Sequence, residues 1–185
     1  MPGDQKVIQV RIGGFGGQGV VLAGALLGHA AVRDGLWVSG SNSYGAQARG
    51  GAARSEVVLS NRPIAFPHVL QADVLIAMSQ SAYDAFSDNM AEQDPVVIYD
   101  AGLVVPRNLD AARQEAMTAT EAAVSDLGNK QVANIVLLGA MAALTEIVSI
   151  GALETAVKEQ VDPRFRDLNL RALARGFQLG IEGER

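Results

Sequence analysis

The glycine-rich segment at residues 13–19 constrains the fold of this chain more than any other stretch. It follows residues 6–12, whose β-branched side chains favour an extended, pleated strand. It leads into residues 21–31, which are rich in good helix formers. A strand, a glycine loop and a helix in this order predict the opening of a βαβ unit, and therefore an α/β protein.

Within this segment, Gly14, Gly16 and Gly19 fit the spacing G-x-G-x-x-G. Glycines let the chain turn tightly and bring its N–H groups close to a ligand, and the N-terminus of the following helix favours an anion at the same place. We therefore regard Gly14, Gly16, Gly17, Gln18 and Gly19 as candidate residues of an anion-binding loop. The alternative is that the glycines only allow close helix–strand packing and bind nothing.

A dinucleotide site would also need an acidic residue about 20 positions further on, where it would bind the ribose hydroxyls. Residues 36–44 contain neither an acidic residue nor an arginine that could bind a 2′-phosphate. The sequence therefore disfavours NAD or NADP as the ligand.

Strand-like and helix-like runs alternate along the rest of the chain. We expect strands at residues 36–40, 52–60, 73–78, 94–100 and 115–117, a short edge segment at 64–66, and helices at 81–90, 121–124, 132–148, 152–161 and 168–179. Ser79 and Ser149 are suited to cap the helices that follow them. This alternation predicts a three-layer, Rossmann-like α/β domain around a mostly parallel sheet, with residues 1–185 in a single domain.

The run at residues 132–148 is apolar nearly all round, with Asn134 as its polar exception. A helix of this kind must be buried on every side, either by its own domain or by a partner. Because 49% of the chain is hydrophobic and only 19% is charged, we expect it to bury surface against a partner, with this helix contributing to the assembly.

Composition excludes several kinds of site. The net charge of -5 argues against nucleic acid as a partner, because binding to phosphates needs a basic face. The absence of cysteine excludes disulfides, thiolate nucleophiles and thiolate-bound iron–sulfur clusters on this chain. The two histidines, His29 and His68, have no partners at metal-ligand spacing. We therefore expect no metal site.

The sequence gives no sign of export or membrane insertion. Residues 1–5 lack the features of a signal peptide. The longest apolar run, residues 135–144, is shorter than the ~20 residues that span a bilayer. We expect a cytoplasmic protein with no membrane partner.

A second unusual stretch is polar and glycine-rich and covers residues 41–51. We expect it to be a loop that leaves the second strand beside the glycine-rich segment, at the edge where α/β sheets bind ligands. Ser43, Tyr44, Arg49 and Gly50 are candidate binding residues, because Arg49 offers a fork for phosphate or carboxylate and Tyr44 offers a ring and a hydroxyl. The alternative is that Arg49 forms an ion pair in a subunit interface. No set of residues indicates catalysis, since neither a G-x-S-x-G elbow nor a Walker loop occurs.

Several motifs, in order and spacing, resemble the gamma subunit of 2-oxoacid:ferredoxin oxidoreductases. They are Gly14-Phe15-Gly16-Gly17-Gln18-Gly19-Val20, Ser43-Tyr44-Gly45 with Arg49-Gly50-Gly51, and Gly128-Asn129 with Ala133-Asn134 and Leu138-Gly139-Ala140. The similarity extends from about Val7 to Gly176.

The resemblance implies a multi-subunit enzyme that oxidatively decarboxylates a 2-oxoacid and forms an acyl-CoA. It implies thiamine diphosphate, Mg and [4Fe–4S] clusters on partner subunits, with no cofactor bound by this chain alone and coenzyme A as co-substrate. Ferredoxin, or NAD through a further subunit, would accept the electrons. The gamma chain would help to assemble the complex and border the coenzyme A region.

One departure from the family pattern lies in the second loop. Many members have Tyr-Gly-Pro-Glu before the arginine, whereas this chain has Tyr44-Gly45-Ala46-Gln47. The loss of a carboxylate and of a rigid proline changes the charge and shape of this loop.

The resulting hypothesis is a non-redox subunit of a thiamine-dependent 2-oxoacid oxidoreductase, inactive alone, whose Tyr44 and Arg49 face coenzyme A or a neighbouring subunit. The alternative is a stand-alone nucleotide-binding module or regulator that uses the glycine-rich segment for its ligand.

Overall fold

A computed structural model describes residues 6–45, 52–109 and 112–183 of the chain. The strands are β1 (Val7–Phe15), β2 (Trp37–Tyr44), β3 (Ala52–Ser60), β4 (Val74–Ala77), β5 (Val96–Asp100) and β6 (Arg113–Met117). The helices are α1 (Val20–Arg33), α2 (Gln80–Phe86), α3 (Ala119–Ser125), α4 (Ala133–Thr145), α5 (Ile150–Gln160) and α6 (Arg166–Gly183).

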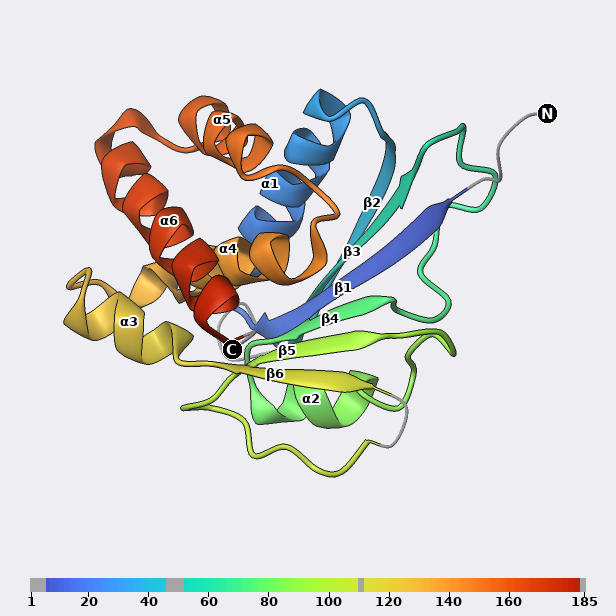
Figure 1. The fold of residues 1–185 in the computed structure, drawn as a ribbon, viewed down its shortest axis with the longest axis horizontal. Helices are drawn as coiled ribbons and strands as arrows, with labels where there is room; N and C mark the ends of the chain where they lie inside the picture. Colours follow the sequence, from blue (N-terminus) through green and yellow to red (C-terminus); the bar gives the residue numbers. More distant parts are fainter. Residues whose placement is uncertain (1–5, 46–51, 110–111, 184–185) are drawn as a thin grey trace.

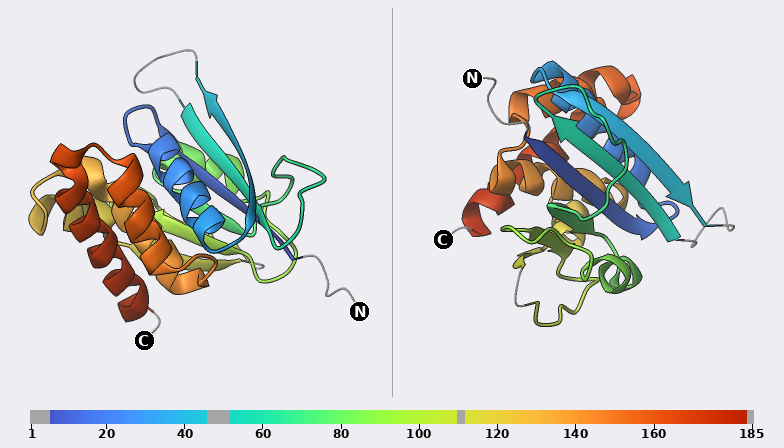
Figure 2. Two further views of the ribbon diagram at one scale, coloured as in Figure 1. Left: turned by 90° about the horizontal axis from the view of Figure 1, so that it is seen from above. Right: turned by 90° about the vertical axis from the view of Figure 1, so that its right-hand side faces the viewer.

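The strands form one sheet in the order β2-β3-β1-β4-β5-β6. The four strands β1, β4, β5 and β6 are parallel, whereas β3 is antiparallel to both of its neighbours. β2 and β3 form a hairpin at one side of the sheet, so the first strand is not paired with the second (Figure 2). The prediction of an α/β fold with a mostly parallel sheet is confirmed.

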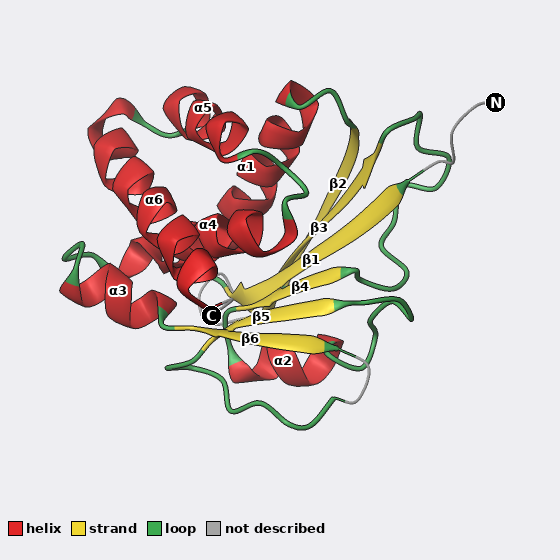
Figure 3. Cartoon of the chain, in the orientation of Figure 1, coloured by secondary structure: helices red, strands yellow, loops and turns green. Residues whose placement is uncertain are grey.

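Helices cover the two faces of the sheet unequally. α1, α4, α5 and α6 lie on one face, and α2 lies on the other (Figures 1 and 3). The side chains of β1 alternate between the two faces: Ile12 belongs to the larger core, whereas a Cβ on Gly13 would lie 2.9 Å from the Cβ of Ala82 in α2. The smaller core on the α2 side is centred on the fully buried Tyr83.

Two expected strand boundaries were wrong. Residues 64–66 form no strand, and they belong to the irregular segment between β3 and β4. The second strand is longer than expected, because it continues through Ser43 and Tyr44 in register with β3. The last three residues of this edge strand, 42–44, are exposed and do not need apolar alternation, so their polar sequence has the composition of a loop.

The apolar helix α4 is buried by its own domain. Leu137, Leu138 and Met141 have no exposed surface, and α6 crosses α4 at very short range. A Cβ on Gly139 would meet the carbonyl oxygen of Leu173, and one on Gly176 would meet the carbonyl oxygen of Val136. The expectation that this helix faces a partner is therefore wrong, because intrachain packing already covers it.

The predicted helix caps are confirmed. The hydroxyl oxygen of Ser79 accepts a hydrogen bond from the N–H of Ala82, and that of Ser149 accepts one from Ala152. Within the described ranges, no helix has the length and apolar content needed to cross a bilayer.

Candidate functional site

The sheet has a topological switch point between β1 and β4. The chain leaves β1 into α1 on one face and leaves β4 into α2 on the other (Figure 1). In open α/β sheets, ligands bind in the crevice that this divergence creates beyond the carboxyl ends of the strands. Here the crevice lies between the glycine-rich segment after β1 and Met78 after β4.

The side chain of Gln18 fills this crevice. Its Oε1 accepts a hydrogen bond of 2.6 Å from the N–H of Phe15, and its Nε2 donates one of 2.8 Å to the carbonyl oxygen of Met78. Gln18 therefore bridges the ends of β1 and β4. An anion that bound the N–H of Phe15 would have to displace this amide.

The glycine-rich segment meets the first helix at a left-handed residue. Gly17 and Gly19 have φ values of 99° and 73°, which favour glycine, and Gly19 precedes the first turn of α1. The Nδ2 of Asn134 in α4 donates a hydrogen bond of 3.0 Å to the carbonyl oxygen of Gly19. A Cβ on Gly19 would collide with that same nitrogen. Asn134, the polar exception of the apolar helix, thus connects α4 to the loop.

The second group of candidate residues lies at the same edge of the sheet. Tyr44 pairs with Ala53, which in turn pairs with Gly14, so Ser43 and Tyr44 lie two strands away from the glycine-rich segment. Two strand spacings amount to about 10 Å. Tyr44 is 66% exposed and is available to a ligand or a partner. Arg49 and Gly50 lie outside the described residues.

The sheet topology also changes the argument about dinucleotides. In the classic arrangement, the strand after the first helix lies beside the first strand and holds the ribose-binding acid. Here β3 lies between β1 and β2, so an acidic residue in β2 would be displaced from the glycine-rich segment by one strand. This arrangement adds a geometric argument against NAD to the compositional one.

A cavity of about 170 Å³ opens beside the switch point, one strand further along. Gly17 and Gln18 line one side, Met78 and Asp100 lie at the ends of β4 and β5, and Lys130 supplies a positive charge. Lys130 follows the break between α3 and α4 and was missed in the sequence, because only the folded chain brings it to this edge.

The buried carboxylate of Asp100 is held by hydrogen bonds. Its Oδ2 accepts bonds from the N–H and the hydroxyl of Thr120, at 2.9 and 2.5 Å, and its Oδ1 accepts one from the N–H of Gly102 at 3.0 Å. These donors lie in the first turn of α3 and in the turn after β5. Asp100 therefore orders the cavity wall.

A carboxyl group whose pKa is raised, that of Asp73, lies at the opposite edge of the sheet. Burial raises the pKa of Asp73, although its Oδ2 accepts a hydrogen bond of 2.6 Å from the N–H of Gln9, which opposes the shift. Asp73 precedes β4, so it is remote from the carboxyl edge. Within the part of the chain that the structure describes, no three His, Asp or Glu side chains gather as metal ligands would.

The family model described as pyruvate ferredoxin/flavodoxin oxidoreductase matches residues 9–179 of the chain. The 2-oxoglutarate synthase subunit KorC of Methanothermobacter thermautotrophicus is 41% identical to this chain. The alignment covers 96% of this chain and 97% of KorC. The ketoisovalerate oxidoreductase subunit VorA of the same organism is 34% identical over 96% of this chain, which spans only 38% of VorA.

A solved structure also matches this chain over nearly its whole length. The keto/oxoacid ferredoxin oxidoreductase gamma subunit from Geobacter sulfurreducens PCA superposes with a TM-score of 0.86 at 37% identity, and the match covers 96% of this chain and 98% of that chain.

Proposed function

Because the chain belongs to the pyruvate ferredoxin/flavodoxin oxidoreductase family, as a gamma subunit of its multi-subunit 2-oxoacid:ferredoxin members, we propose that its enzyme acts on 2-oxoglutarate. The observation that carries this choice of substrate is the full-length match to KorC at 41% identity. The match to VorA has lower identity and ends within a longer chain.

In this proposal the reaction converts 2-oxoglutarate, coenzyme A and two oxidised ferredoxins into succinyl-CoA, CO₂, a proton and two reduced ferredoxins. Thiamine diphosphate with Mg on a partner subunit would supply the carbon chemistry, and [4Fe–4S] clusters on partner subunits would take the electrons. The present chain has no cysteine with which to bind a cluster. We infer that it is inactive alone and contributes assembly and part of the coenzyme A region.

The carboxyl edge of the sheet is the part of this chain that we assign to coenzyme A. It combines the first turn of α1, which has no acidic residue, with the positive charge of Lys130. Both features favour a phosphate-bearing ligand. Tyr44 lies at the same edge and is exposed. Arg49 and Gly50 remain predicted contacts, and the assignment of residues 1–185 to a single domain remains a prediction.

The alternative of a stand-alone nucleotide-binding module has less support. The side chain of Gln18 occupies the switch-point crevice, and β3 separates β1 from β2. Two relatives that match over nearly their whole length are named as a synthase subunit, KorC, and as the gamma subunit of a ferredoxin oxidoreductase.

The test is an assay of the co-expressed, anaerobically purified complex with coenzyme A and ferredoxin. We expect turnover of 2-oxoglutarate to exceed that of pyruvate and 3-methyl-2-oxobutanoate at least tenfold, and no turnover by the purified single chain. Preference for another 2-oxoacid would overturn the substrate assignment, and turnover by the single chain would overturn the inactive-subunit assignment.

A further inference from the structure

The outer edge of β2 is an unprotected edge of the sheet. The strand has eight residues, WVSGSNSY, with no charge and no proline, and it pairs with β3 in continuous register from Trp37 to Tyr44. Proteins usually protect a long edge strand with charges, proline or a bulge, because its free N–H and C=O groups bind further strands. None of these devices is present along the edge of β2.

The opposite edge of the sheet, β6, is protected. It has five residues, and its charged residues Arg113 and Glu115 form an ion pair of 3.2 Å. The side chain of Gln114, between them, hydrogen-bonds to Tyr83 and to the carbonyl oxygen of Arg107. The lack of protection is therefore specific to β2.

The pairing with β3 shows which backbone groups of β2 are free. The N–H of Gly45 donates to the carbonyl oxygen of Ala52 at 2.7 Å, so Gly45 faces β3. The backbone N–H and C=O groups of successive residues in an antiparallel strand point alternately to the two sides. Those of Ser43 and Ser41 therefore also face β3, whereas those of Asn42 and Gly40 point outward. By the same rule, the backbone N–H and C=O groups of Tyr44 and Val38 point outward. No strand in the described ranges pairs with this side of β2.

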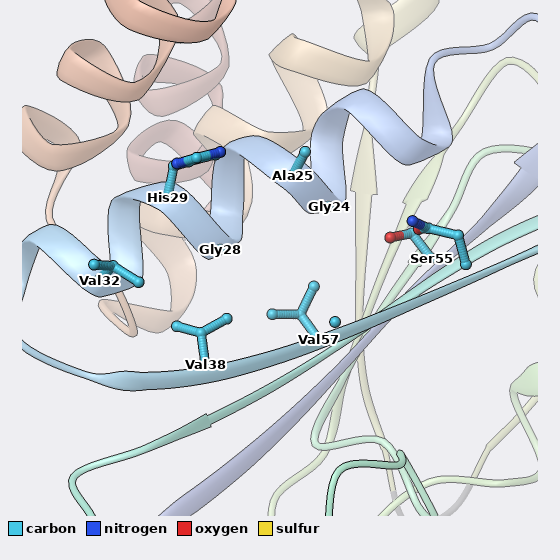
Figure 4. A pocket seen from close by; sticks show the side chains of 10 residues that line it. Gly24, Ala25, Gly28, His29, Val32, Val38, Ser55 and Val57 are labelled. Atoms are coloured by element: carbon cyan, nitrogen blue, oxygen red, sulfur yellow. The ribbon is translucent and has the colours of Figure 1, made fainter. Parts of the chain in front are cut away.

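A shallow groove continues this edge over the helical face of the sheet. It has a volume of about 260 Å³ and lies between α1 and β2, with Gly28 and Val32 on the helix and Val38 on the strand (Figure 4). Gly40 and Asn42 of β2 also line it. Its lining includes no Asp, Glu, Lys or Arg. Val32 is 61% exposed beside it. An uncharged segment could thus lie along β2 and place side chains in the groove.

A longer relative supplies a candidate for the polypeptide that covers this edge. A unit like the present chain spans 38% of VorA, so in VorA it is continuous with a second region of the same enzyme. In KorC, by contrast, the matching unit makes up 97% of the chain, so under the proposed function the second region lies on a separate subunit held by surface contacts. The edge of β2 also ends at Tyr44, beside the carboxyl edge that we assign to coenzyme A.

We propose that the outer edge of β2, with the groove between α1 and β2, binds an extended, uncharged strand of the partner subunit that corresponds to the remainder of VorA. This inference rests on the proposed function, since it requires the multi-subunit enzyme. The added strand hydrogen-bonds to the outward N–H and C=O groups of Gly40 and Asn42, and its apolar side chains enter the groove.

The experiment compares Asn42→Pro with Asn42→Ala in the co-expressed complex. Proline removes the outward N–H of Asn42 and leaves every bond to β3 intact, whereas alanine keeps the N–H. Native mass spectrometry should show at least tenfold less of the identified partner subunit bound to Asn42→Pro than to Asn42→Ala, while both isolated variants melt like the wild type. Equal assembly of the two variants would overturn the proposal. If Asn42→Pro still binds the partner subunit but loses a homodimer that the wild-type chain forms, the edge of β2 binds a second copy of this chain instead.

Hydrogen exchange on the wild type tests the same contact without any variant. In the isolated chain, the amides of Gly40 and Asn42 should exchange rapidly and that of Ser41 slowly. In the complex, Gly40 and Asn42 should gain at least tenfold protection, and unchanged exchange would contradict the proposed strand. If the wild-type chain does not assemble with any oxidoreductase subunit, the proposed function itself fails, which differs from selective failure of Asn42→Pro.

Discussion

The glycines of the loop after β1 and the glycines of the α4–α6 helix pair differ in what surrounds them. Beyond Gly14 and Gly19, the nearest atoms are the amide ends of Gln18 and Asn134, and Gly17 faces open space. Beyond Gly139 and Gly176, the nearest atoms are backbone atoms of the opposing helix. Side-chain ends can move, but the backbone of a packed helix cannot.

This difference separates two functions that the sequence does not distinguish. The loop can rearrange around a ligand at the cost of a few hydrogen bonds, whereas the helix pair has a single tolerated geometry. The loop is therefore suited to binding, and the helix pair holds the layer of helices that supports it. The predictions below test this contrast from the largest expected effect to the smallest.

The largest effect is expected for Gly176→Val, which places a branched side chain against the backbone of Val136. Overpacking against a rigid neighbour should lower the free energy of unfolding by about 3 kcal/mol or more. Urea denaturation of the isolated chain measures this loss. Gly151→Val in α5 is the matched control, since nothing lies within 4 Å of its Cβ position. Equal losses for the two variants would show that helix propensity, not the α4–α6 contact, sets the cost.

A smaller effect is expected for Gly17→Ala. The Cβ has space, but the φ of 99° is unfavourable for an L-residue and should cost roughly 1–2 kcal/mol. Gly17→Asn should cost less, because asparagine tolerates positive φ better. Thermal unfolding of both variants measures the difference. A larger loss for asparagine would mean that the loop is limited by space and not by backbone conformation.

The smallest effect on folding is expected for Gln18→Ala, which removes the bonds to Phe15 and Met78. The bond to Phe15 is exposed and the bond to Met78 is only partly buried, so the free energy of unfolding should fall by only about 1 kcal/mol. The freed N–H of Phe15, next to the N-terminus of α1, should then bind inorganic phosphate, seen as a higher melting temperature of Gln18→Ala in phosphate than in chloride. Gln131→Ala, which alters an exposed residue of the adjacent cavity, should show no such gain. A loss of several kcal/mol for Gln18→Ala would make the loop as rigid as the helix pair.

Local sequence patterns were sufficient to predict most of the helices and strands. The β-branched runs gave β4 and β5, Ser79 and Ser149 marked helix starts, and the apolar run with a single asparagine gave α4. The candidate loop residues were found from glycine spacing. These features depend on residues that are close in sequence, where propensity and capping act directly.

The strand order and the contacts of the candidate site could not be predicted in this way, because they depend on segments that are distant in the sequence. No local pattern indicates that β3 lies between β1 and β2, that Lys130 reaches the carboxyl edge, or that Asn134 holds Gly19. The polar composition around Ser43 favoured a loop because an exposed edge strand has no apolar alternation.

The sequence by itself determined the order of the elements, the family and the lack of cysteine ligands for a cluster on this chain. Only the tertiary structure decided that Gln18 fills the switch-point crevice, that α6 buries α4 and that β2 is left with a free edge. The physical reason is that propensities act over a few residues, whereas strand order and helix crossings are set by packing across the whole chain.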